Sequence, residues 1–269
     1  MSDAITQPGT DNGLLVNLQH IPFETDPGLG GRARIGLIVL ASDHTVEHEF
    51  RRIIDIPGVA FYESRILNSP TITPETLADM GGRIEGCASV ILPGMDLDVV
   101  AFGCTSASMV LGEETVFERV RAGRPEAKPT NPVTSAFAAF KTLGVERIAL
   151  LTPYTDDINQ GMRAYFEAGG VKVPVMGSFN EESDNVAARI TQDAIRNAAL
   201  TIGRHDAVDA VFVSCTSLRL AEVAADIEAD LGKPVTSSNH AMAWHCLRLA
   251  GIEDKLPQWG KLYGLGLAE

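Results

Sequence analysis

The second half of this 269-residue chain repeats the first half. Three blocks match in the same order; they start at Arg34 and Arg147, at Cys104 and Cys215, and at Lys128 and Lys233. The offset between matched positions falls slowly from 113 to 105 residues, as changes in loop length would produce. A chance likeness of two strand–helix stretches would not explain why Cys-Thr-Ser recurs after a strand in both halves. The repeat therefore predicts a duplicated structural unit.

Each half alternates between strand-like and helix-like segments. Short, continuous apolar runs predict strands buried on both faces, as in parallel sheets; they cover residues 34–40, 59–66, 97–102, 147–151, 171–176 and 210–213. Helical spacing is found at residues 45–54, 74–91, 156–168 and 183–202. This alternation predicts an α/β fold of two pseudo-symmetric, doubly wound parallel-sheet halves, with the active site in the cleft between them.

The repeat also predicts the domain boundaries. Residues 1–31 are polar and precede the first matched block, so we expect an N-terminal arm. The first α/β half is expected at 32–131 and the second at 132–269. A C-terminal helix at 239–252 is a candidate to cross over to the first half.

Cys104 and Cys215 each follow a predicted strand and begin the same Cys-Thr-Ser sequence. Loops at the carboxyl ends of strands carry function in open α/β sheets, and a pseudo-twofold axis would bring these two loops face to face. We expect each cysteine to precede a helix, whose N-terminus would lower the thiol pKa. The alternative is that each is a small buried residue. Cys87 and Cys246 lie within predicted helices without Thr-Ser, and we interpret them as structural.

The residues after each cysteine suit an anionic substrate. The hydroxyls of Thr105, Ser106, Thr216 and Ser217, with the N–H groups of the turns, are fitted to hold a carboxylate or enediolate oxygen. Two opposed units supply one thiolate to attack or deprotonate and one thiol to deliver a proton from the other side. That arrangement predicts inversion of a stereocentre, or thiol addition followed by rotation and elimination.

Composition excludes several classes of partner. The formal net charge of −13, with no basic block to offset it, argues against nucleic acid and against an anionic membrane surface. No apolar run reaches the roughly 18 residues needed to span a bilayer, and the polar N-terminus lacks a secretory pattern. With four cysteines in a chain of this length, we expect free thiols in a reduced, cytoplasmic setting.

We expect neither a metal nor another cofactor. His44 and His48 are four residues apart on one helix face and so are able to chelate, whereas His240 and His245 are five apart and share a face poorly. No cysteine pair has the spacing of a zinc site. No glycine-rich phosphate motif follows a strand.

The strand–Cys-Thr-Ser element in both halves resembles the aspartate/glutamate racemase superfamily, and more closely its branch of maleate cis-trans isomerases and arylmalonate decarboxylases. The resemblance covers residues 32–266. Arylmalonate decarboxylases keep only the second cysteine, so the presence of both favours isomerase or racemase chemistry. The resemblance to maleate isomerases implies that the Cys104 thiolate adds to a substrate double bond and that Cys215 acts as the acid. It also implies that Tyr154 and Asn185 bind a substrate carboxylate; alternatively, Tyr154 fills the core or loop and Asn185 caps a helix.

The loop after the first strand departs from the family pattern. Maleate isomerases carry a Pro-Ser-Ser-Asn-Thr-like loop whose Asn binds substrate, but residues 40–45 read Leu-Ala-Ser-Asp-His-Thr, with Asp43 in the Asn position. The longer sequence, Leu-Ala-Ser-Asp-His-Thr-Val-Glu-His-Glu-Phe, resembles the ectoine-utilisation (EutA-type) subgroup. An anionic Asp43 would repel a dicarboxylate and suit a substrate with an ammonium group. Alternatively, Asp43 is a simple helix cap.

Together these features predict a cofactor-independent isomerase or racemase that acts on a small carboxylate or amino acid, with a role in ectoine degradation implied by the loop. A decarboxylase working through an enediolate, with Cys215 as proton donor, is one alternative. A non-catalytic ligand-binding accessory protein is the other. Homo-oligomers are common in relatives, so we expect one here.

Overall fold

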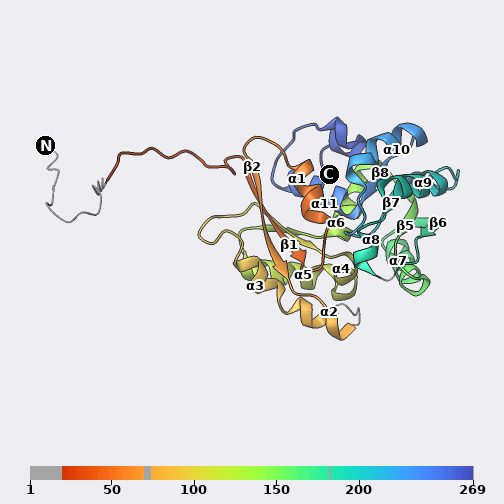
Figure 1. Cartoon of the computed structure of the whole chain (residues 1–269), viewed down its shortest axis with the longest axis horizontal. Coiled ribbons are helices and arrows are strands. Elements are labelled where there is room, and N and C mark those ends of the chain that lie inside the picture. Colours follow the sequence, from red (N-terminus) through yellow and green to blue (C-terminus); the bar gives the residue numbers. More distant parts are fainter. Residues whose placement is uncertain (1–19, 70–73, 182, 269) are drawn as a thin grey trace, which may run out of the picture.

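The computed structural model of the chain describes residues 20–69, 74–181 and 183–268, which form two four-stranded parallel sheets (Figure 1). The sheet orders are β2-β1-β3-β4 and β6-β5-β7-β8, so the two repeats share one topology. The strands are β1 (Ala33–Leu40), β2 (Val59–Ile66), β3 (Val99–Gly103), β4 (Lys128–Thr130), β5 (Arg147–Thr152), β6 (Lys172–Ser178), β7 (Ala210–Val213) and β8 (Val235–Ser237). The expected α/β fold of two parallel-sheet halves is confirmed.

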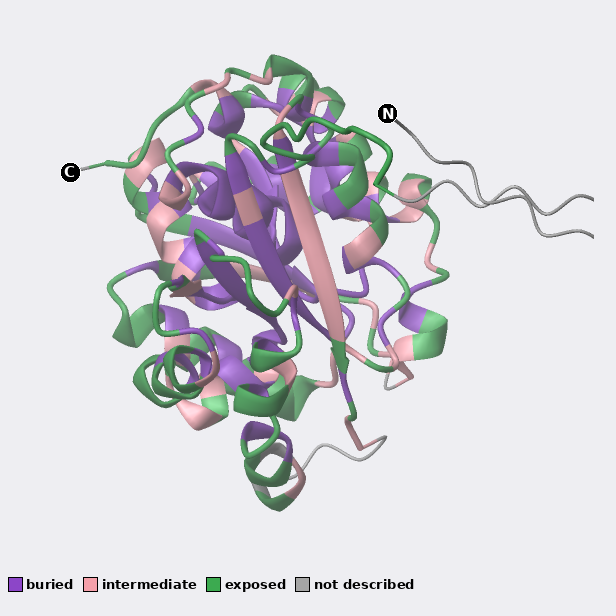
Figure 2. Cartoon of the chain, turned by 90° about the vertical axis from the view of Figure 1, so that its left-hand side faces the viewer, coloured by how far each residue is buried: buried purple, intermediate pink, exposed green. Residues whose placement is uncertain are grey.

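Helices cover both faces of each sheet, which is why the strands read as continuous apolar runs. In β1, Ile35 and Leu37 belong to one apolar cluster with α1 (Val46–Ile53), while Ile38 points to the opposite face, towards α3 (Ile84–Ser89) and α5 (Glu113–Gly123). The same alternation in β5 separates Ala149 and Leu151 from Ile148 and Leu150. Figure 2 shows the buried strands at the centre of the molecule and the exposed residues on the helices and loops around them.

Two segments predicted as single helices are each divided in two. The segment 74–91 forms α2 (Pro74–Gly81) and α3, separated at Gly82 and Arg83; two consecutive glycines there weaken a continuous helix. The segment 183–202 forms α8 (Asp184–Ala187) and α9 (Gln192–Gly203). The side chain of Thr191 accepts a hydrogen bond from the Ala194 N–H and so begins a new helix.

The two repeats exchange their last helices. The helix α6 (Pro132–Leu143) follows β4, yet Phe140 packs with Ile148 and Leu150 of the second sheet. The helix α11 (Ser238–Leu249) follows β8, yet Met242 packs with Leu37 of the first sheet. The two helices also contact each other (Figure 1). The last helix of each repeat therefore packs against the sheet of the other repeat.

The remaining helices are α4 (Thr105–Leu111), α7 (Asp156–Ala168), α10 (Ala224–Leu231) and the 3₁₀ turns η1 (Ala221–Val223), η2 (Pro257–Trp259) and η3 (Lys261–Gly264). Of the expected N-terminal arm, residues 1–19 lie outside the described residues, and residues 20–29 are exposed. No helix within the described ranges is long and apolar enough to cross a membrane.

Candidate active site

The two Cys-Thr-Ser segments line one cavity at the carboxyl ends of β3 and β7. Besides these six residues, the described lining consists of Leu40, Asn68, Ser69, Thr76, Met80, Tyr154 and Asp184. The lining residues come from both repeats, and most of them lie in or next to loops that follow strands. The fold therefore brings together the two thiols that the repeat predicts as a pair.

Cys104 is the N-cap residue of α4, with an extended backbone (φ −141°). Its carbonyl accepts hydrogen bonds from the Ser108 N–H (3.1 Å) and the Ser108 hydroxyl (2.7 Å). Its Sγ lies 3.7 Å from the Ser106 hydroxyl. The start of α4 thus fixes the Cys104 backbone, and the expected helix after the first cysteine is present.

Cys215 has a different setting, because a turn and not a helix follows it. Its φ of +147° falls in a region that non-glycine residues rarely occupy. The first helical turn after it is η1, six residues further on. The expectation of a helix directly after the second cysteine is therefore wrong. Its Sγ accepts a hydrogen bond from the Ser217 N–H at 3.4 Å.

Ser238, the first residue of α11, joins the two cysteine loops. Its hydroxyl oxygen accepts a hydrogen bond from the Cys215 N–H (3.2 Å) and another from the Thr105 hydroxyl (3.2 Å). A second cross-repeat contact runs from the Thr45 hydroxyl to the Ser217 carbonyl at 2.9 Å. Sequence reasoning missed Ser238, because its importance depends on where α11 begins relative to both loops.

The thiols are not acidified as the sequence predicts. Burial raises the pKa of Cys104 from 9.0 to about 11, although the Ala107 N–H and the Ser106 hydroxyl act against this shift. Burial raises the pKa of Cys215 from 9.0 to about 12, although Tyr154 and the Ser217 N–H oppose it. Loss of hydration outweighs the helix and hydrogen-bond contributions. Both thiols are protonated at neutral pH before substrate binds.

These pKa values predict how the unliganded thiols react with iodoacetamide. While the pH is below the thiol pKa, the thiolate fraction rises about tenfold for each unit by which the pH increases. Alkylation of Cys104 and Cys215 should therefore accelerate about 100-fold from pH 7 to pH 9. Peptide mass spectrometry would follow each cysteine separately. A rate that is already constant at about pH 8 would contradict the raised pKa values.

Tyr154 follows β5 of the second sheet and lines the cavity together with both thiols. Its carbonyl accepts hydrogen bonds from the Asn159 amide (2.8 Å) and from the Ser178 hydroxyl, and its N–H donates to the Thr152 hydroxyl (3.2 Å). Its side chain lines the cavity and stabilises the Cys215 thiolate, while burial raises the pKa of the phenol. Tyr154 is held where its hydroxyl reaches the second thiol.

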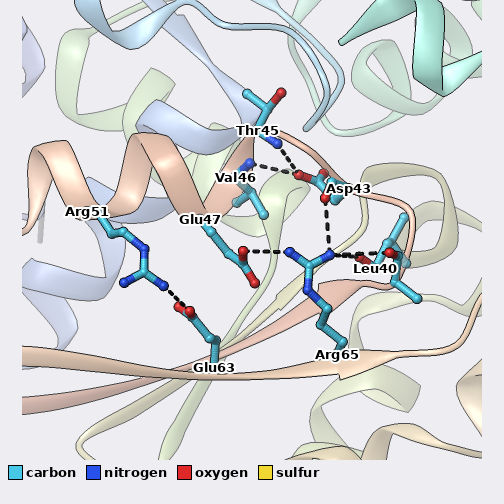
Figure 3. Close-up of polar contacts among 9 residues, drawn as sticks. Leu40, Asp43, Thr45, Val46, Glu47, Arg51, Glu63 and Arg65 are labelled. Carbon is cyan, nitrogen blue, oxygen red and sulfur yellow. Dashed lines mark hydrogen bonds and ion pairs between the residues drawn. The ribbon is translucent and has the colours of Figure 1, made fainter.

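Asp43 caps α1 from the loop after β1 (Figure 3). Its Oδ1 accepts hydrogen bonds from the Thr45 N–H (2.7 Å) and the Val46 N–H (2.8 Å). Burial raises its pKa; these two N–H groups, the Thr216 side chain and Arg65 oppose the shift. Asp43 is outside the cavity wall, but its charge raises the pKa of Cys104. The cap and an electrostatic effect on the site are thus both present.

The loop that holds Asp43 is fixed by Arg65, which extends from β2 (Figure 3). The Arg65 guanidinium donates to the carbonyls of Leu40 (3.2 Å), Ala41 (3.3 Å) and Asp43 (3.1 Å), and it pairs with Glu47 at 2.5 Å. The Arg65 guanidinium is therefore bound by the loop carbonyls and by Glu47. Of the described residues that line the cavity, none is basic.

Asp184, which the sequence analysis passed over, lines the cavity, whereas its neighbour Asn185 does not. The exposed Asn185 amide oxygen lies 2.6 Å from Nε2 of His44. Burial and the nearby Asp43 raise the pKa of Asp184, while His44 opposes the shift. The register of α8 thus puts a carboxylate, and not an amide, at the cavity wall. Only the start of that helix, which propensity alone does not locate, would have revealed it.

His44 and His48, the two histidines with chelating spacing, contact different residues. His44 faces Asn185, and His48 lies 3.9 Å from Glu222. Within the part of the chain that the structure describes, no group of three or more His, Cys, Asp and Glu side chains is placed to hold a metal ion.

Comparison with known proteins places this geometry in a family. Residues 35–263 match the family model described as "Arylmalonate decarboxylase". The maleate isomerase of Nocardia farcinica is 29% identical over 245 residues, covering 86% of this chain and 96% of that protein. The arylmalonate decarboxylase of Bordetella bronchiseptica is 28% identical over 242 residues, covering 85% and 95%.

One solved structure is similar to the chain in both fold and sequence. It is a cysteine-to-serine mutant of the Nocardia farcinica maleate cis-trans isomerase with a covalently bound succinylcysteine intermediate. Its TM-score is 0.76 at 27% identity, with 86% of this chain and 98% of that chain covered. The family match spans most of the chain and both cysteine loops, so this protein belongs to the arylmalonate decarboxylase family, within which it is similar to maleate isomerases.

Proposed function

We propose that the protein is a cofactor-independent isomerase or racemase of a small carboxylate, with Cys104 and Cys215 as opposed thiols. The observation that carries the proposal is the single cavity lined by both Cys-Thr-Ser segments. The similar maleate isomerase with a succinylcysteine intermediate supports covalent chemistry at a thiol. Intact thiols in both repeats speak against a non-catalytic accessory protein.

For an unsaturated substrate, the chemistry is addition followed by elimination. On substrate binding, the Cys104 thiol gives up its proton to solvent, and the resulting thiolate sulfur forms a bond to one alkene carbon. The electron pair of the double bond takes a proton from Cys215 at the neighbouring carbon, which leaves Cys215 as the thiolate. Rotation about the resulting single bond precedes return of that proton to Cys215 and cleavage of the carbon–sulfur bond. Tyr154 stabilises Cys215 while it lacks its proton.

For an amino acid, the same groups perform inversion. One thiolate takes the α-proton, and the other thiol supplies a proton to the opposite face. The enediolate formed between the two steps carries its negative charge on the carboxylate oxygens. The Thr105, Ser106, Thr216 and Ser217 hydroxyls line the cavity and are suited to stabilise that charge.

The charges around the cavity favour a substrate that carries a cation as well as a carboxylate. Asp184 lines the cavity and Asp43 lies behind it, while both thiols have raised pKa values. A substrate ammonium would face the Asp184 carboxylate, would be attracted by the charge of Asp43 and would favour thiolate formation, whereas a second substrate carboxylate would oppose it. An amino acid related to ectoine degradation, such as a diaminobutyrate derivative, meets this requirement.

Replacing Asp43 or Asp184 with asparagine should change selectivity. Removal of either negative charge is expected to raise the kcat/KM ratio of maleate to the cationic substrate at least about tenfold, because like charges repel in a partly desolvated site. Asparagine also caps helices, so Asp43→Asn keeps α1 intact. The exposed Asp193→Asn is the matched control. Unchanged selectivity in both site variants would refute the charge argument.

The proposed function is tested by NMR in deuterated water across a panel of small amino acids and dicarboxylic acids, maleate included. Exchange at an α-carbon with loss of optical activity identifies a racemase, and appearance of the trans isomer identifies a cis-trans isomerase. Release of carbon dioxide would identify the decarboxylase alternative. Absence of all three with every panel member would contradict the proposal.

One observation favours decarboxylation as the second candidate. A largely apolar hollow between α4 and α7 adjoins the cavity and shares Ser106 and Tyr154 with it. Met109, Ile158 and Met162 line this hollow, which suits a substrate with an apolar substituent. Cys215 alone would serve as the proton donor in that reaction.

A further inference from the structure

The backbone around Cys215 needs support from outside its own segment. Cys104 is fixed by the helix that it begins, but Cys215 has a positive φ and is followed by a turn. Such backbone persists only where its surroundings hold it. The polar groups that hold the peptides after Cys215 therefore decide where the second thiol lies.

Asn239 of α11 holds the first of these peptides. Its Nδ2 donates one hydrogen bond to the Thr216 carbonyl (2.8 Å) and one to Oε2 of Glu49 (2.8 Å). Its Oδ1 is buried and has no hydrogen-bond partner among the described residues. The amide is therefore oriented by its two acceptors, since nothing on its oxygen side fixes it.

Glu49 supplies one of those acceptors from the other repeat. It lies on α1, is 1% exposed, and accepts at Oε1 from the Ala221 N–H (2.7 Å). The Glu49 carboxylate thus contacts the end of the Cys215 loop directly, at Ala221. Through Asn239 it also contacts the start of that loop, at Thr216. Glu49 is not part of the cavity lining and has no direct route to a substrate.

We propose that Glu49 is a positioning residue for Cys215: its carboxylate fixes the Asn239 amide so that it holds the Thr216 carbonyl and, with it, the second thiol. The inference rests on the proposed function only in taking Cys215 as a reacting thiol. Its geometric content is independent of the substrate.

The electrostatics agree with this geometry. Burial raises the pKa of Glu49 to about 7, and the charge of Asp43 adds to the shift, while the Ala221 and Leu220 N–H groups and Asn239 oppose it. A neutral side chain would avoid that desolvation. A buried carboxylate is what two converging donors, the Ala221 N–H and the Asn239 amide, require.

The test is Glu49→Gln in the full chain. Glutamine has the same size, but its amide nitrogen would face the Ala221 N–H or the Asn239 amide, both donors. If the Asn239 amide turned over, its oxygen would accept a hydrogen bond from the glutamine amide nitrogen. The same Asn239 oxygen would then face the Thr216 carbonyl oxygen, which is also an acceptor. Either way, the Cys215 loop loses a support while the Cys104 loop keeps its own.

The readout is iodoacetamide alkylation at about pH 9, with both cysteines quantified in the same sample by peptide mass spectrometry. Alkylation of Cys215 should become about tenfold faster, while that of Cys104 changes less than about twofold. With a substrate from the NMR panel, kcat should fall about 10- to 100-fold and KM change less than about threefold. Glu118→Gln, on the exposed face of α5, is the control for loss of a carboxylate.

Asn239→Ala provides the second variant. It should reproduce the Cys215-specific effect, and the double variant should add little, because Glu49 acts through Asn239. If Glu49→Gln fails to fold, the same alkylation measurement on Asn239→Ala decides the matter. Equal changes at both cysteines, no change at Cys215, or additive effects of the two variants would overturn the proposal. Failure of every panel substrate would count against the proposed function and leave the alkylation result valid.

Discussion

Cys104→Ala is expected to lower turnover by about 10³-fold or more while the protein remains folded. In the proposed mechanism, this variant lacks the group that bonds to an unsaturated substrate or that takes one of the two proton-transfer roles. Cys104 is buried at the cavity wall, so loss of its sulfur changes little elsewhere. The measurement is kcat/KM by NMR, with the thermal midpoint as a check of folding.

Cys87→Ser is the control for Cys104→Ala, since Cys87 is a half-buried thiol on α3, away from the cavity. Isomerisation or racemisation within about tenfold of the wild type in Cys104→Ala would exclude a two-thiol reaction. If this variant still releases carbon dioxide but neither isomerises nor racemises a substrate, the result favours the decarboxylase alternative, because that reaction uses Cys215 only.

Cys215→Ser is expected to stop the reaction halfway, with a similar loss of turnover. An unsaturated substrate should add to Cys104 and remain there, because the hydroxyl of serine is a weaker acid and base than the thiol. With an amino acid, the expected result is proton exchange from one face without inversion. Intact-protein mass spectrometry would detect an added mass equal to one substrate, and peptide mapping would locate it.

The similar maleate isomerase with a succinylcysteine intermediate, itself a cysteine-to-serine mutant, gives the precedent for such trapping. An adduct on a residue other than Cys104 would reverse the assignment of the two thiols. Full turnover in Cys215→Ser would remove Cys215 from the mechanism altogether.

The repeat carried most of the fold prediction. Matched apolar runs located the main strands, and the recurring Cys-Thr-Ser located two loops that the structure brings to one cavity. This succeeded because buried parallel strands have a local signature and their carboxyl ends meet at one edge. The divided helices were missed, because their ends depend on Gly81–Gly82 and on the Thr191 cap more than on apolar spacing.

The failures at the site have a common cause. The pKa values of Cys104 and Cys215 depend on burial by both repeats, which no local pattern reports. Asp184 and Ser238 matter because of their position relative to loops far away in the sequence. Asn185 was the nearer match to the family pattern, but the register of α8 turns it towards His44. The ectoine role, the cytoplasmic setting and the homo-oligomer stay predictions.

The most direct test of the central claim, that two thiols serve one substrate in one cavity, is protection from alkylation. Wild-type protein is treated with iodoacetamide at about pH 9 over a range of concentrations of the carboxylate identified by NMR, and each cysteine is quantified. Cys104 and Cys215 should be protected together, with the same half-saturating concentration, while Cys87 is unaffected. Protection of one thiol without the other, or at clearly different concentrations, would contradict a shared site.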